Sequence, residues 1–321
     1  MMTTPTEAET AEAPRPKCPA PADFREAVAE YDRAARVGAW AGPRYRMTYR
    51  VLGEGPPLIV SPGIAATYRG YALMLNILAA RFQTILYDYP GENPGDGAKL
   101  GKITHDHLVD DVFGLIDHLN IGRSFLFGPS FGSTIVLKTL HREPRRFPKA
   151  AIQGAFAHRP LSRAERVGLR LGRLLPGRAN RLPMRDAVLA WNNKIHFPTE
   201  IADRWELYAE QNGLTPIAPM AARLDMLGRL DLRPILPAIP NEVLVLQGNE
   251  DRIVRRRYYD EIVAGLPNAQ GVIMPMVGHQ PHYTHAEGMA QALNDFFLPC
   301  APEGCPNEAT RADRPIHASD V

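Results

Sequence analysis

Residues 124 to 132 read Ser124-Phe125-Leu126-Phe127-Gly128-Pro129-Ser130-Phe131-Gly132. An apolar run enters a Gly-x-Ser-x-Gly pattern, which predicts a strand followed by a sharp turn into a helix. Such a turn exposes the hydroxyl of Ser130, and the glycines at 128 and 132 let the strand and the helix pass closely without a side-chain clash. Because the pattern arises by chance in roughly one chain in ten of this length, the surrounding sequence must decide whether Ser130 is a nucleophile.

The sequence on both sides of this turn alternates between short apolar runs and amphipathic segments of helical length. The predicted strands are 45–51, 58–61, 84–87, 124–127, 150–153, 242–246 and 271–274. The predicted helices are 23–36, 67–81, 105–119, 131–141, 254–266 and 284–297. Gly53-Glu54-Gly55-Pro56 joins the first two strands, which we predict to form an antiparallel opening. The later strands read as buried on both faces, and they indicate an α/β fold with a doubly wound, mostly parallel sheet.

The chain divides into a core, an insertion and two tails. We predict that residues 23–156 and 236–298 form the α/β core. Residues 157–235 hold about two helical units and no clear strand, and they are predicted to form a helical cap over one end of the sheet. Residues 1–22 and 299–321 have little apolar surface to bury and are predicted to be disordered.

Composition excludes several classes of protein. The 321 residues are 45% apolar, and 37 Lys and Arg against 35 Asp and Glu give a net charge of +2, which argues against a general nucleic-acid partner. The cysteines Cys18, Cys300 and Cys305 lie in the predicted tails, so none can staple the core, and a reducing compartment is expected. Because there is no apolar signal segment and no run of about 18 apolar residues, we expect an unanchored, cytoplasmic protein.

A base and an acid for Ser130 follow two later predicted strands. Asp251 stands in the loop after strand 242–246, and His279 stands in the loop after strand 271–274. Functional groups in a parallel α/β sheet gather at the carboxyl ends of the strands, so we expect these three side chains to meet. A serine activated by a histidine that an acid orients defines a catalytic triad, and the order Ser, Asp, His is one of its known chain orders.

From Tyr45 to Phe297 the chain resembles the α/β-hydrolase fold family, in particular its capped, esterase- and lipase-like members with a serine nucleophile. Four motifs in the family's order carry the resemblance: Asp88-Tyr89-Pro90-Gly91, Gly128-x-Ser130-x-Gly132, Gly248-x-x-Asp251-x-x-Val254 and Gly278-His279. The resemblance implies the α/β-hydrolase core, a catalytic triad of Ser130, Asp251 and His279, and no metal or organic cofactor.

The resemblance also implies an oxyanion hole. The family often has His-Gly after its third strand, and the backbone N–H that follows the glycine forms half of the hole. Here the segment Ser61-Pro62-Gly63-Ile64 keeps the glycine and lacks the histidine. The expected donors are the backbone N–H groups of Ile64 and Phe131, because backbone donors do not require a particular side chain.

Neighbouring residues leave alternatives for the acid and the base. Glu250 could supply the acid in place of Asp251, which could also merely begin a helix. His282 and His285 lie close to His279 in the sequence. The Gly-x-x-Asp spacing favours Asp251, and the glycine directly before His279 favours that histidine.

Two other motifs are weaker. His105-Asp106-His107 resembles part of a metal site, but no third ligand stands at a suitable spacing, and its last two residues better fit a helix start. The segment 95–103 superficially matches a phosphate loop, but Asp96 occupies the first glycine position and Ile103 replaces the Ser or Thr that would hold magnesium. We therefore predict neither a metal site nor a phosphate loop.

Residues 159–185 are strongly basic, with eight arginines against the single acid Glu165. A helix in this segment would carry an apolar face of Val167, Leu171, Leu174 and Leu175, with the arginines largely off it. We expect this face to cover the active site and the arginines to be solvated. The alternative is a weak contact of the basic amphipathic helix with a membrane or lipid surface.

These features predict a serine hydrolase that cleaves a carboxylic ester or a related acyl bond through an acyl-enzyme. The expected substrate is a small molecule with a hydrophobic acyl chain, bound in a cap pocket that includes Trp191, Phe197, Trp205 and Met220. Carbon–carbon bond hydrolases, aminopeptidases and acyltransferases use the same triad and stay open as alternatives. A non-catalytic member of the fold that binds a ligand under the cap also stays open.

Overall fold

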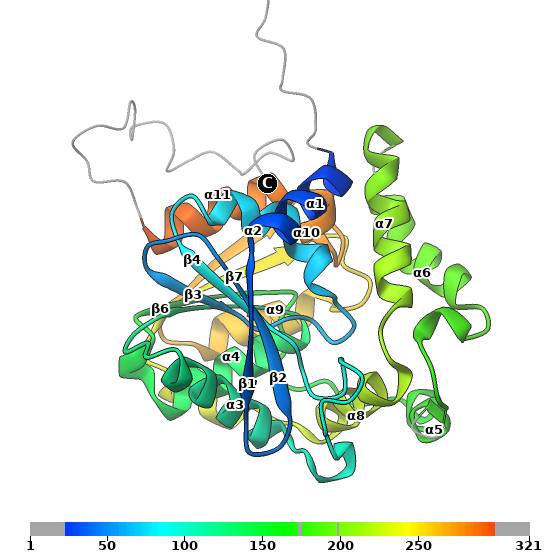
Figure 1. Cartoon of the computed structure of the whole chain (residues 1–321), viewed down its shortest axis with the longest axis horizontal. Helices are drawn as coiled ribbons and strands as arrows, with labels where there is room; N and C mark the ends of the chain where they lie inside the picture. Colours follow the sequence, from blue (N-terminus) through cyan, green and yellow to red (C-terminus); the bar gives the residue numbers. More distant parts are fainter. Residues whose placement is uncertain (1–22, 173–174, 198, 299–321) are drawn as a thin grey trace, which may run out of the picture.

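The computed structural model describes residues 23–172, 175–197 and 199–298 of the chain. The disorder predicted for residues 1–22 and 299–321, and with it all three cysteines, lies outside the described residues. Figure 1 shows a twisted sheet with helices on both sides and further helices along one margin.

An eight-stranded sheet forms the centre of the described part of the chain, in the order β1-β2-β4-β3-β5-β6-β7-β8. The strands are β1 (Arg36–Ala41), β2 (Arg46–Leu52), β3 (Pro57–Val60), β4 (Gln83–Tyr87), β5 (Phe125–Pro129), β6 (Lys149–Gln153), β7 (Glu242–Gly248) and β8 (Ala269–Met274). β1 pairs with β2 and β2 with β4 in antiparallel fashion, and all other neighbours are parallel. The predicted α/β fold with a mostly parallel sheet and an antiparallel start is confirmed.

The antiparallel start differs from the predicted one in two respects. The predicted first helix ends at Ala34, and β1, which the sequence analysis lacks, begins at Arg36. β2 does not pair with β3, because β4 lies between them. The burial of the strands gives the physical reason: three of the four residues of β3 are fully buried, as a central parallel strand requires, whereas β2 is mostly half-exposed and suits the sheet's antiparallel end.

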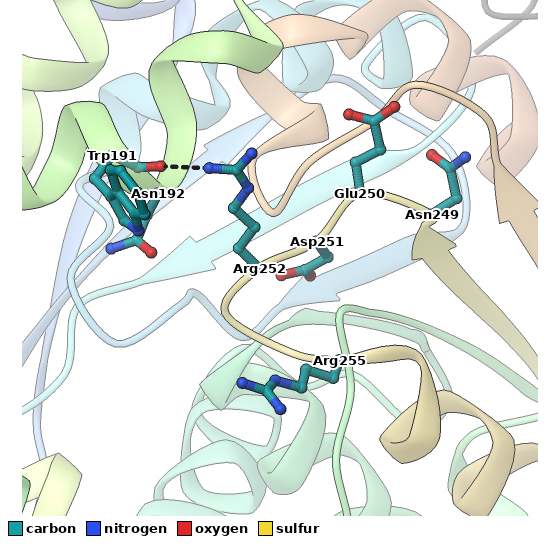
Figure 2. Close-up of a pocket in the computed structure, with 7 residues that line it drawn as sticks. All are labelled: Trp191, Asn192, Asn249, Glu250, Asp251, Arg252 and Arg255. Carbon is teal, nitrogen blue, oxygen red and sulfur yellow. Dashed lines mark hydrogen bonds between the residues drawn. The ribbon is translucent and has the colours of Figure 1, made fainter.

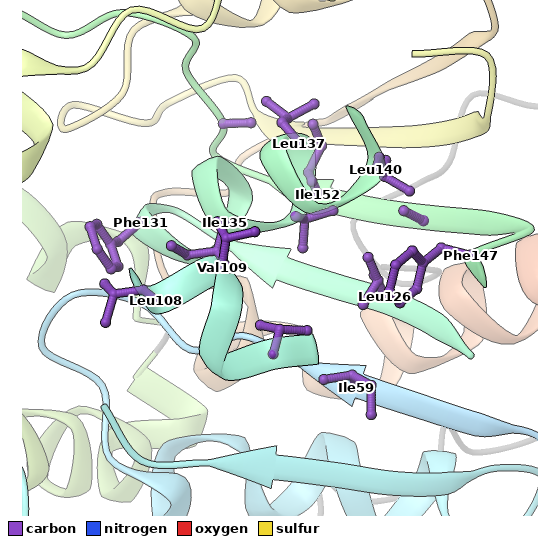
Figure 3. Packing of buried hydrophobic residues seen from close by; sticks show 14 of the residues in the cluster. Ile59, Leu108, Val109, Leu126, Phe131, Ile135, Leu137, Leu140, Phe147 and Ile152 are labelled. Atoms are coloured by element: carbon purple, nitrogen blue, oxygen red, sulfur yellow. The ribbon is translucent and has the colours of Figure 1, made fainter. Parts of the chain in front are cut away.

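Two hydrophobic cores lie on opposite faces of the sheet, because successive side chains of a strand alternate between its faces. Ile59, Leu126, Ile152 and Val245 face one core, and their neighbours Val60, Phe127, Ala151 and Leu244 face the other. The first core, shown in Figure 3, packs against α3 (His105–His118), α4 (Phe131–Arg142) and α9 (Arg256–Gly265). The second packs against α1 (Phe24–Ala34), α2 (Ala72–Leu78), α10 (Pro281–Thr284) and α11 (Ala286–Phe297). Within the described ranges, no helix combines the length and the apolar character needed to cross a bilayer.

The segment between β6 and β7 contains four α-helices in its described part, where the sequence predicts about two. They are α5 (Arg163–Gly172), α6 (Arg185–Asn193), α7 (Ala202–Gly213) and α8 (Ile217–Arg229), at the right of Figure 1. The Leu232 N–H donates to the Ala157 carbonyl at 2.9 Å, so the two ends of the segment meet at its base. Its boundaries at 157 and 235 stay a prediction.

Candidate active site

Ser130 lies at the turn between β5 and α4. Its backbone φ of 50° and ψ of −116° are strained for a residue that has a Cβ. The Ser130 N–H donates to the Gln153 carbonyl at 2.7 Å, and the Ser130 carbonyl accepts from the Ser133 N–H at 3.0 Å. A Cβ on Gly132 would lie 1.9 Å from the Ser61 carbonyl oxygen, so only glycine fits there. The turn therefore holds Ser130 in place and leaves it partly exposed.

The structure brings together the three side chains predicted to form the triad. His279 Nε2 lies 3.0 Å from Ser130 Oγ, and His279 Nδ1 lies 2.6 Å from Asp251 Oδ2. Asp251 Oδ1 accepts the backbone N–H groups of Ile253 and Val254, both at 2.8 Å. Because the Asp251 side chain is fully buried, these donors fix its carboxylate and, through it, the ring of His279.

The side chains that could replace this acid and this base have other partners. Glu250 Oε2 lies 3.3 Å from His196 Nδ1, and the Glu250 side chain is 47% exposed. His285 Nδ1 lies 2.8 Å from Thr284 Oγ1. The ring of His282 stacks on another aromatic side chain with no hydrogen-bond partner within the described part of the chain. The geometry thus favours the same acid and base that the sequence spacing favours.

Gly154, just after β6, is a residue of the site that the sequence analysis does not single out. Its φ is +54°, and a Cβ there would lie 2.9 Å from Cε1 and 3.1 Å from Nδ1 of His279. The backbone therefore passes the imidazole at a distance that only glycine allows. A signal was present in the sequence, because Gly154 stands at the carboxyl end of a strand beside that of Ser130.

We expect Gly154→Ala to lower kcat for ester hydrolysis by about 100-fold, because displacing a catalytic group by about 1 Å has an effect of this size. The positive φ adds a loss of roughly 1 kcal/mol in the free energy of unfolding. Steady-state kinetics and thermal unfolding measure the two effects. Gly122→Ala is the matched control, since a Cβ at that position meets nothing within 4 Å. A wild-type kcat for Gly154→Ala would contradict the close packing on His279.

The loop after β3, expected to form half of the oxyanion hole, is held in place by two buried tyrosines. The Tyr89 hydroxyl donates to the Pro62 carbonyl at 3.0 Å, and the Gly63 N–H donates to the Tyr71 hydroxyl oxygen at 2.9 Å. These two bonds fix both polar ends of one peptide unit. Burial raises the pKa of Tyr71 and of Tyr89, so both phenols stay protonated.

The next part of the loop is anchored from the segment between β6 and β7. Arg223 Nε, on α8, donates to the Ile64 carbonyl at 3.0 Å, and Thr215 Oγ1 donates to the Ala65 carbonyl at 3.0 Å. The Ile64 N–H belongs to the peptide unit between Gly63 and Ile64. The peptide units before and after it are both hydrogen-bonded, so the direction of this N–H is fixed from both sides. The Phe131 N–H opens α4, where a helix offers no acceptor of its own. These anchors hold the loop after β3 in place without the histidine that the family often has there.

Sequence reasoning missed most of these anchors. Tyr89 lies within the motif Asp88-Tyr89-Pro90-Gly91 and could have been found there. Tyr71 and Arg223 belong to no motif. Arg223 is 2% exposed in its side chain, pairs with Glu92 and lies over the ring of Tyr89 at 5.3 Å from its centroid. A buried arginine of this kind is recognisable only once the fold brings its partners together.

His282 stands beside the candidate site as a buried, neutral histidine. Its ring stacks on Tyr71 at 4.6 Å between centroids, and neither of its nitrogens has a hydrogen-bond partner within the described residues. Burial lowers the pKa of His282 to about 3, with a smaller contribution from His279 in the same direction. In the unfolded chain the pKa of a histidine is about 6.5.

Below pH 6.5 the unfolded state therefore binds a proton that folded His282 does not, and the free energy of unfolding falls as the pH falls. We expect His282→Phe to remove about 2 kcal/mol of the stability lost between pH 7 and pH 5. Urea denaturation at the two pH values measures the difference, and any overpacking by the larger ring cancels in the comparison. The exposed His141 serves as control through His141→Phe. An unchanged pH dependence in His282→Phe would contradict a neutral buried imidazole.

The four residues predicted to share an acyl pocket do not lie in one cavity. Trp191 is 75% exposed, and Trp205 lines a cavity between α6 and α7. Phe197 packs on Tyr208 at 5.5 Å between ring centroids, and Met220 lines a separate cavity between α5 and α8. These cavities do not bring the four side chains together, because the composition of the segment does not determine which neighbour each helix face meets, and the shared acyl pocket stays a prediction.

A polar cavity of about 690 Å³ lies beside the loop of Asp251. Figure 2 shows its lining residues: Trp191, Asn192, Asn249, Glu250, Asp251, Arg252 and Arg255. Ser130 does not line it, and both carboxylate oxygens of Asp251 are already bonded to protein donors. The cavity therefore lies behind the acid and not over the nucleophile.

The apolar face of α5 does not cover the candidate site. Val167 is 56% and Leu171 is 60% exposed, whereas Leu169 is buried. Leu174 lies outside the described residues. The expectation of a covering face is wrong because α5 packs on α8 through Leu169 and Gly172 and turns its other side outward.

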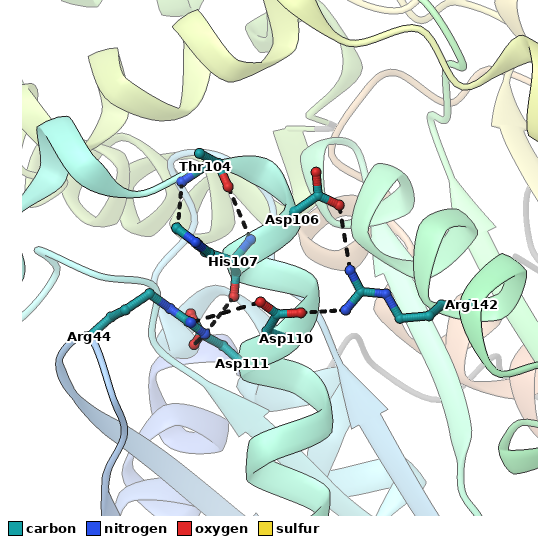
Figure 4. Close-up of polar contacts among 7 residues, drawn as sticks. All are labelled: Arg44, Thr104, Asp106, His107, Asp110, Asp111 and Arg142. Carbon is teal, nitrogen blue, oxygen red and sulfur yellow. Dashed lines mark hydrogen bonds and ion pairs between the residues drawn. The ribbon is translucent and has the colours of Figure 1, made fainter.

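The stretch His105-Asp106-His107 serves the start of α3. The Thr104 hydroxyl oxygen accepts from the His107 N–H and His107 Nδ1 accepts from the Thr104 N–H, both at 3.3 Å (Figure 4). Asp106 lies 3.5 Å from Arg142, as Figure 4 also shows. In the described part of the chain, no group of three or more His, Cys, Asp or Glu side chains is arranged to hold a metal ion.

The family model described as the alpha/beta hydrolase fold matches residues 56–286, well over half of the chain, and the chain belongs to this family. The 2-hydroxy-6-oxo-6-phenylhexa-2,4-dienoate hydrolase of Burkholderia cepacia is 24% identical over 262 residues, which cover 79% of this chain and 91% of that protein. The 2-hydroxymuconate semialdehyde hydrolase of Pseudomonas putida is 27% identical over 252 residues, which cover 77% of this chain and 85% of that protein.

A solved structure agrees with the fold. The enol-lactonase from Burkholderia xenovorans LB400 superposes with a TM-score of 0.69 at 22% identity, covering 81% of this chain and 99% of that one. The likeness extends over nearly the whole neighbour, so the sheet and its covering helices are those of an α/β hydrolase.

Proposed function

We propose that the protein is a serine hydrolase that cleaves a carboxylic ester or a related acyl bond of a small, hydrophobic acyl substrate. The observation that carries this proposal is the hydrogen-bonded chain from Ser130 Oγ through His279 to Asp251. It joins a strained, partly exposed serine to a base whose orientation a buried carboxylate fixes.

The proposed reaction has two halves. Ser130 Oγ attacks the carbonyl carbon while His279 Nε2 takes its proton, and the oxyanion accepts hydrogen bonds from the Ile64 and Phe131 N–H groups. His279 then protonates the leaving alkoxide, which departs and leaves the acyl group on Ser130. Water attacks this ester, His279 takes the water's proton, and return of that proton to Ser130 releases the acid. Asp251 keeps Nδ1 of His279 protonated and stabilises the imidazolium in both halves.

Carbon–carbon bond hydrolysis is the second candidate, and the two enzyme relatives favour it. Their names specify conjugated hydroxy-oxo acids and a semialdehyde, which contain no ester, so hydrolysis of such compounds breaks a carbon–carbon bond. The leaving group is then a carbanion that must be delocalised into the conjugated acid and stabilised by a cation or by donors. Arg223 contacts the loop of Ile64, but its charge is paired with Glu92, which supports the acyl bond as first choice.

One substrate panel separates the two candidates. Initial rates are measured on p-nitrophenyl acetate, butyrate and octanoate and on 2-hydroxy-6-oxo-6-phenylhexa-2,4-dienoate, with wild type and Ser130→Ala. The proposal expects turnover of the esters that depends on Ser130, with kcat/KM rising with chain length. Efficient cleavage of the dienoate with poor ester turnover would replace the proposal by the second candidate.

A fluorophosphonate probe tests whether the triad acts at all. Native protein is expected to be labelled at Ser130, and Ser130→Ala and heat-denatured protein are expected to stay unlabelled. Labelling of Ser130 with no turnover in the panel would direct the search to amides and acyl acceptors. Absence of labelling in native protein would favour a non-catalytic binding protein of this fold.

A further inference from the structure

The apolar side chains exposed on the described surface are concentrated in one segment. Of the nine large hydrophobic side chains that are strongly exposed, seven lie between residues 167 and 195: Val167, Leu171, Leu175, Met184, Val188, Trp191 and Ile195. The first three follow helical spacing along and just beyond α5, and the last four follow it along α6 and its ends. A water-facing surface alone does not account for two such stripes.

The same segment carries a concentrated positive charge. Residues 159–195 contain nine Lys and Arg against two acids, while the whole chain has a net charge of +2, so the rest of the chain is net acidic. Arg163, Arg166 and Arg170 of α5 are exposed and have no ion-pair partner among the described residues. Helical spacing places these three arginines along one side of the apolar stripe formed by Val167, Leu171 and Leu175.

The two helices stand at the outer margin of the molecule. In Figure 1, α5 lies outside α8, and α6 lies outside α7, on the side away from the sheet. On its inner side α5 borders a largely apolar cavity of about 260 Å³ against α8. The half-exposed Leu175 lines this cavity and also belongs to the outer apolar stripe. An apolar chain that reaches Leu175 from outside therefore meets an apolar space under the helix.

We propose that the outer surface of α5 and α6 docks on the surface of an anionic phospholipid membrane. The exposed Val, Leu and Trp side chains enter the boundary between headgroups and acyl chains, and the flanking arginines bind headgroup phosphates. A helix with an apolar stripe bordered by unpaired basic residues lies in this way in the plane of an anionic interface. The exposed Trp191 fits the same boundary, where one end of the indole is apolar and the other wet.

Charge decides between this partner and the others. A second copy of the chain docked through this same surface would bring two strongly basic segments together, which like-charge repulsion opposes. A nucleic acid would use the arginines and leave the seven apolar side chains without a partner. Of these partners, only an anionic membrane offers negative charges to the arginines and an apolar layer beneath them to the exposed hydrophobic side chains.

The test is co-sedimentation of the full chain with vesicles of phosphatidylcholine alone and of equal parts phosphatidylcholine and phosphatidylglycerol. We expect binding to the anionic vesicles that falls with rising salt, and little binding to the neutral ones. The variant Arg163→Gln/Arg166→Gln/Arg170→Gln is expected to reduce the partition coefficient by about 100-fold. Val167→Ser/Leu171→Ser is expected to lower binding at high salt most strongly, because only the apolar contribution survives there.

The matched control is Arg36→Gln/Arg123→Gln/Arg145→Gln, which removes the same charge from exposed arginines outside the segment. Equal losses in the two triple variants would overturn the proposal, because binding would then follow net charge and not this surface. Absence of binding to anionic vesicles by wild type would also overturn it. Light scattering measures the oligomeric state of the same samples. A wild-type dimer that dissociates in Val167→Ser/Leu171→Ser would assign the surface to a second copy instead. The readout does not use hydrolysis, so its failure and a failure of the proposed activity are distinguishable.

Discussion

Ser130→Ala is expected to lower kcat/KM for p-nitrophenyl ester hydrolysis by about 10⁴- to 10⁶-fold. The reason is geometric: His279 Nε2 lies 3.0 Å from Ser130 Oγ, and no other hydroxyl is hydrogen-bonded to that nitrogen within the described residues. Steady-state kinetics with active-site titration by a fluorophosphonate measures the loss. His279→Ala is expected to cost a similar factor, and the double variant is expected to cost no more than either single one, since the two residues act as a unit.

The stability of the Ser130 variants gives an independent check on the turn. Alanine keeps the strain of a φ of 50°, so the melting temperature of Ser130→Ala should stay near that of wild type. Glycine relieves the strain, so Ser130→Gly is expected to be inactive and more stable by roughly 1 kcal/mol. A Ser130→Gly variant that is less stable than Ser130→Ala would contradict a strained turn. Substantial ester turnover in Ser130→Ala would remove Ser130 from the proposed reaction.

Arg223→Met is expected to lower both the stability of the protein and its activity. It removes the hydrogen bond from Nε to the Ile64 carbonyl and leaves the nearly buried carboxylate of Glu92 without its cation. Breaking a buried pair from one side destabilises a protein by about 3–5 kcal/mol. Loosening the loop that carries the Ile64 N–H is expected to lower kcat by about 10- to 100-fold at nearly constant KM, because the oxyanion contact forms only in the transition state.

A double variant separates these two effects of Arg223. Arg223→Met/Glu92→Leu removes the unpaired carboxylate and should recover most of the lost stability, because an apolar pair can replace a buried ion pair. Its kcat should stay low, since Ile64 still lacks its anchor. Arg223→Lys tests the geometry, because its single ammonium cannot serve both the carbonyl and the carboxylate. Wild-type kcat in the stable double variant would show that Arg223 acts on the fold alone and does not position the loop.

The sequence predicts the parallel part of the sheet well, because each central strand is a continuous apolar run bounded by turn residues. It fails at the antiparallel end, where pairing depends on partners far away in the chain. β2 and β3 adjoin in the sequence and are separated by β4 in the sheet, and the chain from Arg36 to Ala41 lacks the apolar run that would mark a strand. Which strands become neighbours depends on contacts between segments far apart in the chain, and no local pattern marks such contacts.

The candidate site divides in the same way. Ser130, Asp251 and His279 stand in local motifs at strand ends, so their meeting follows from the parallel topology. Tyr71 and Arg223 fix the oxyanion loop through contacts made by distant elements, and no spacing in the sequence marks them. Three of the side chains predicted to share an acyl pocket, Trp191, Trp205 and Met220, line different cavities for a related reason. Residue type within this segment does not specify which neighbour each helix faces.

The wide spacing of the site along the chain sets when the protein can first become reactive. Ser130 and His279 are separated by 149 positions, and the base stands after β8, the last strand of the sheet. A chain emerging from the ribosome therefore carries the proposed nucleophile long before the proposed base, and the serine is expected to stay unreactive until the two meet. Contacts between such distant residues form late in folding because the entropy of closing the intervening loops opposes them. Recovery of hydrolysis after dilution from denaturant thus reports completion of the whole sheet, and intrinsic fluorescence, which follows local collapse, should recover earlier.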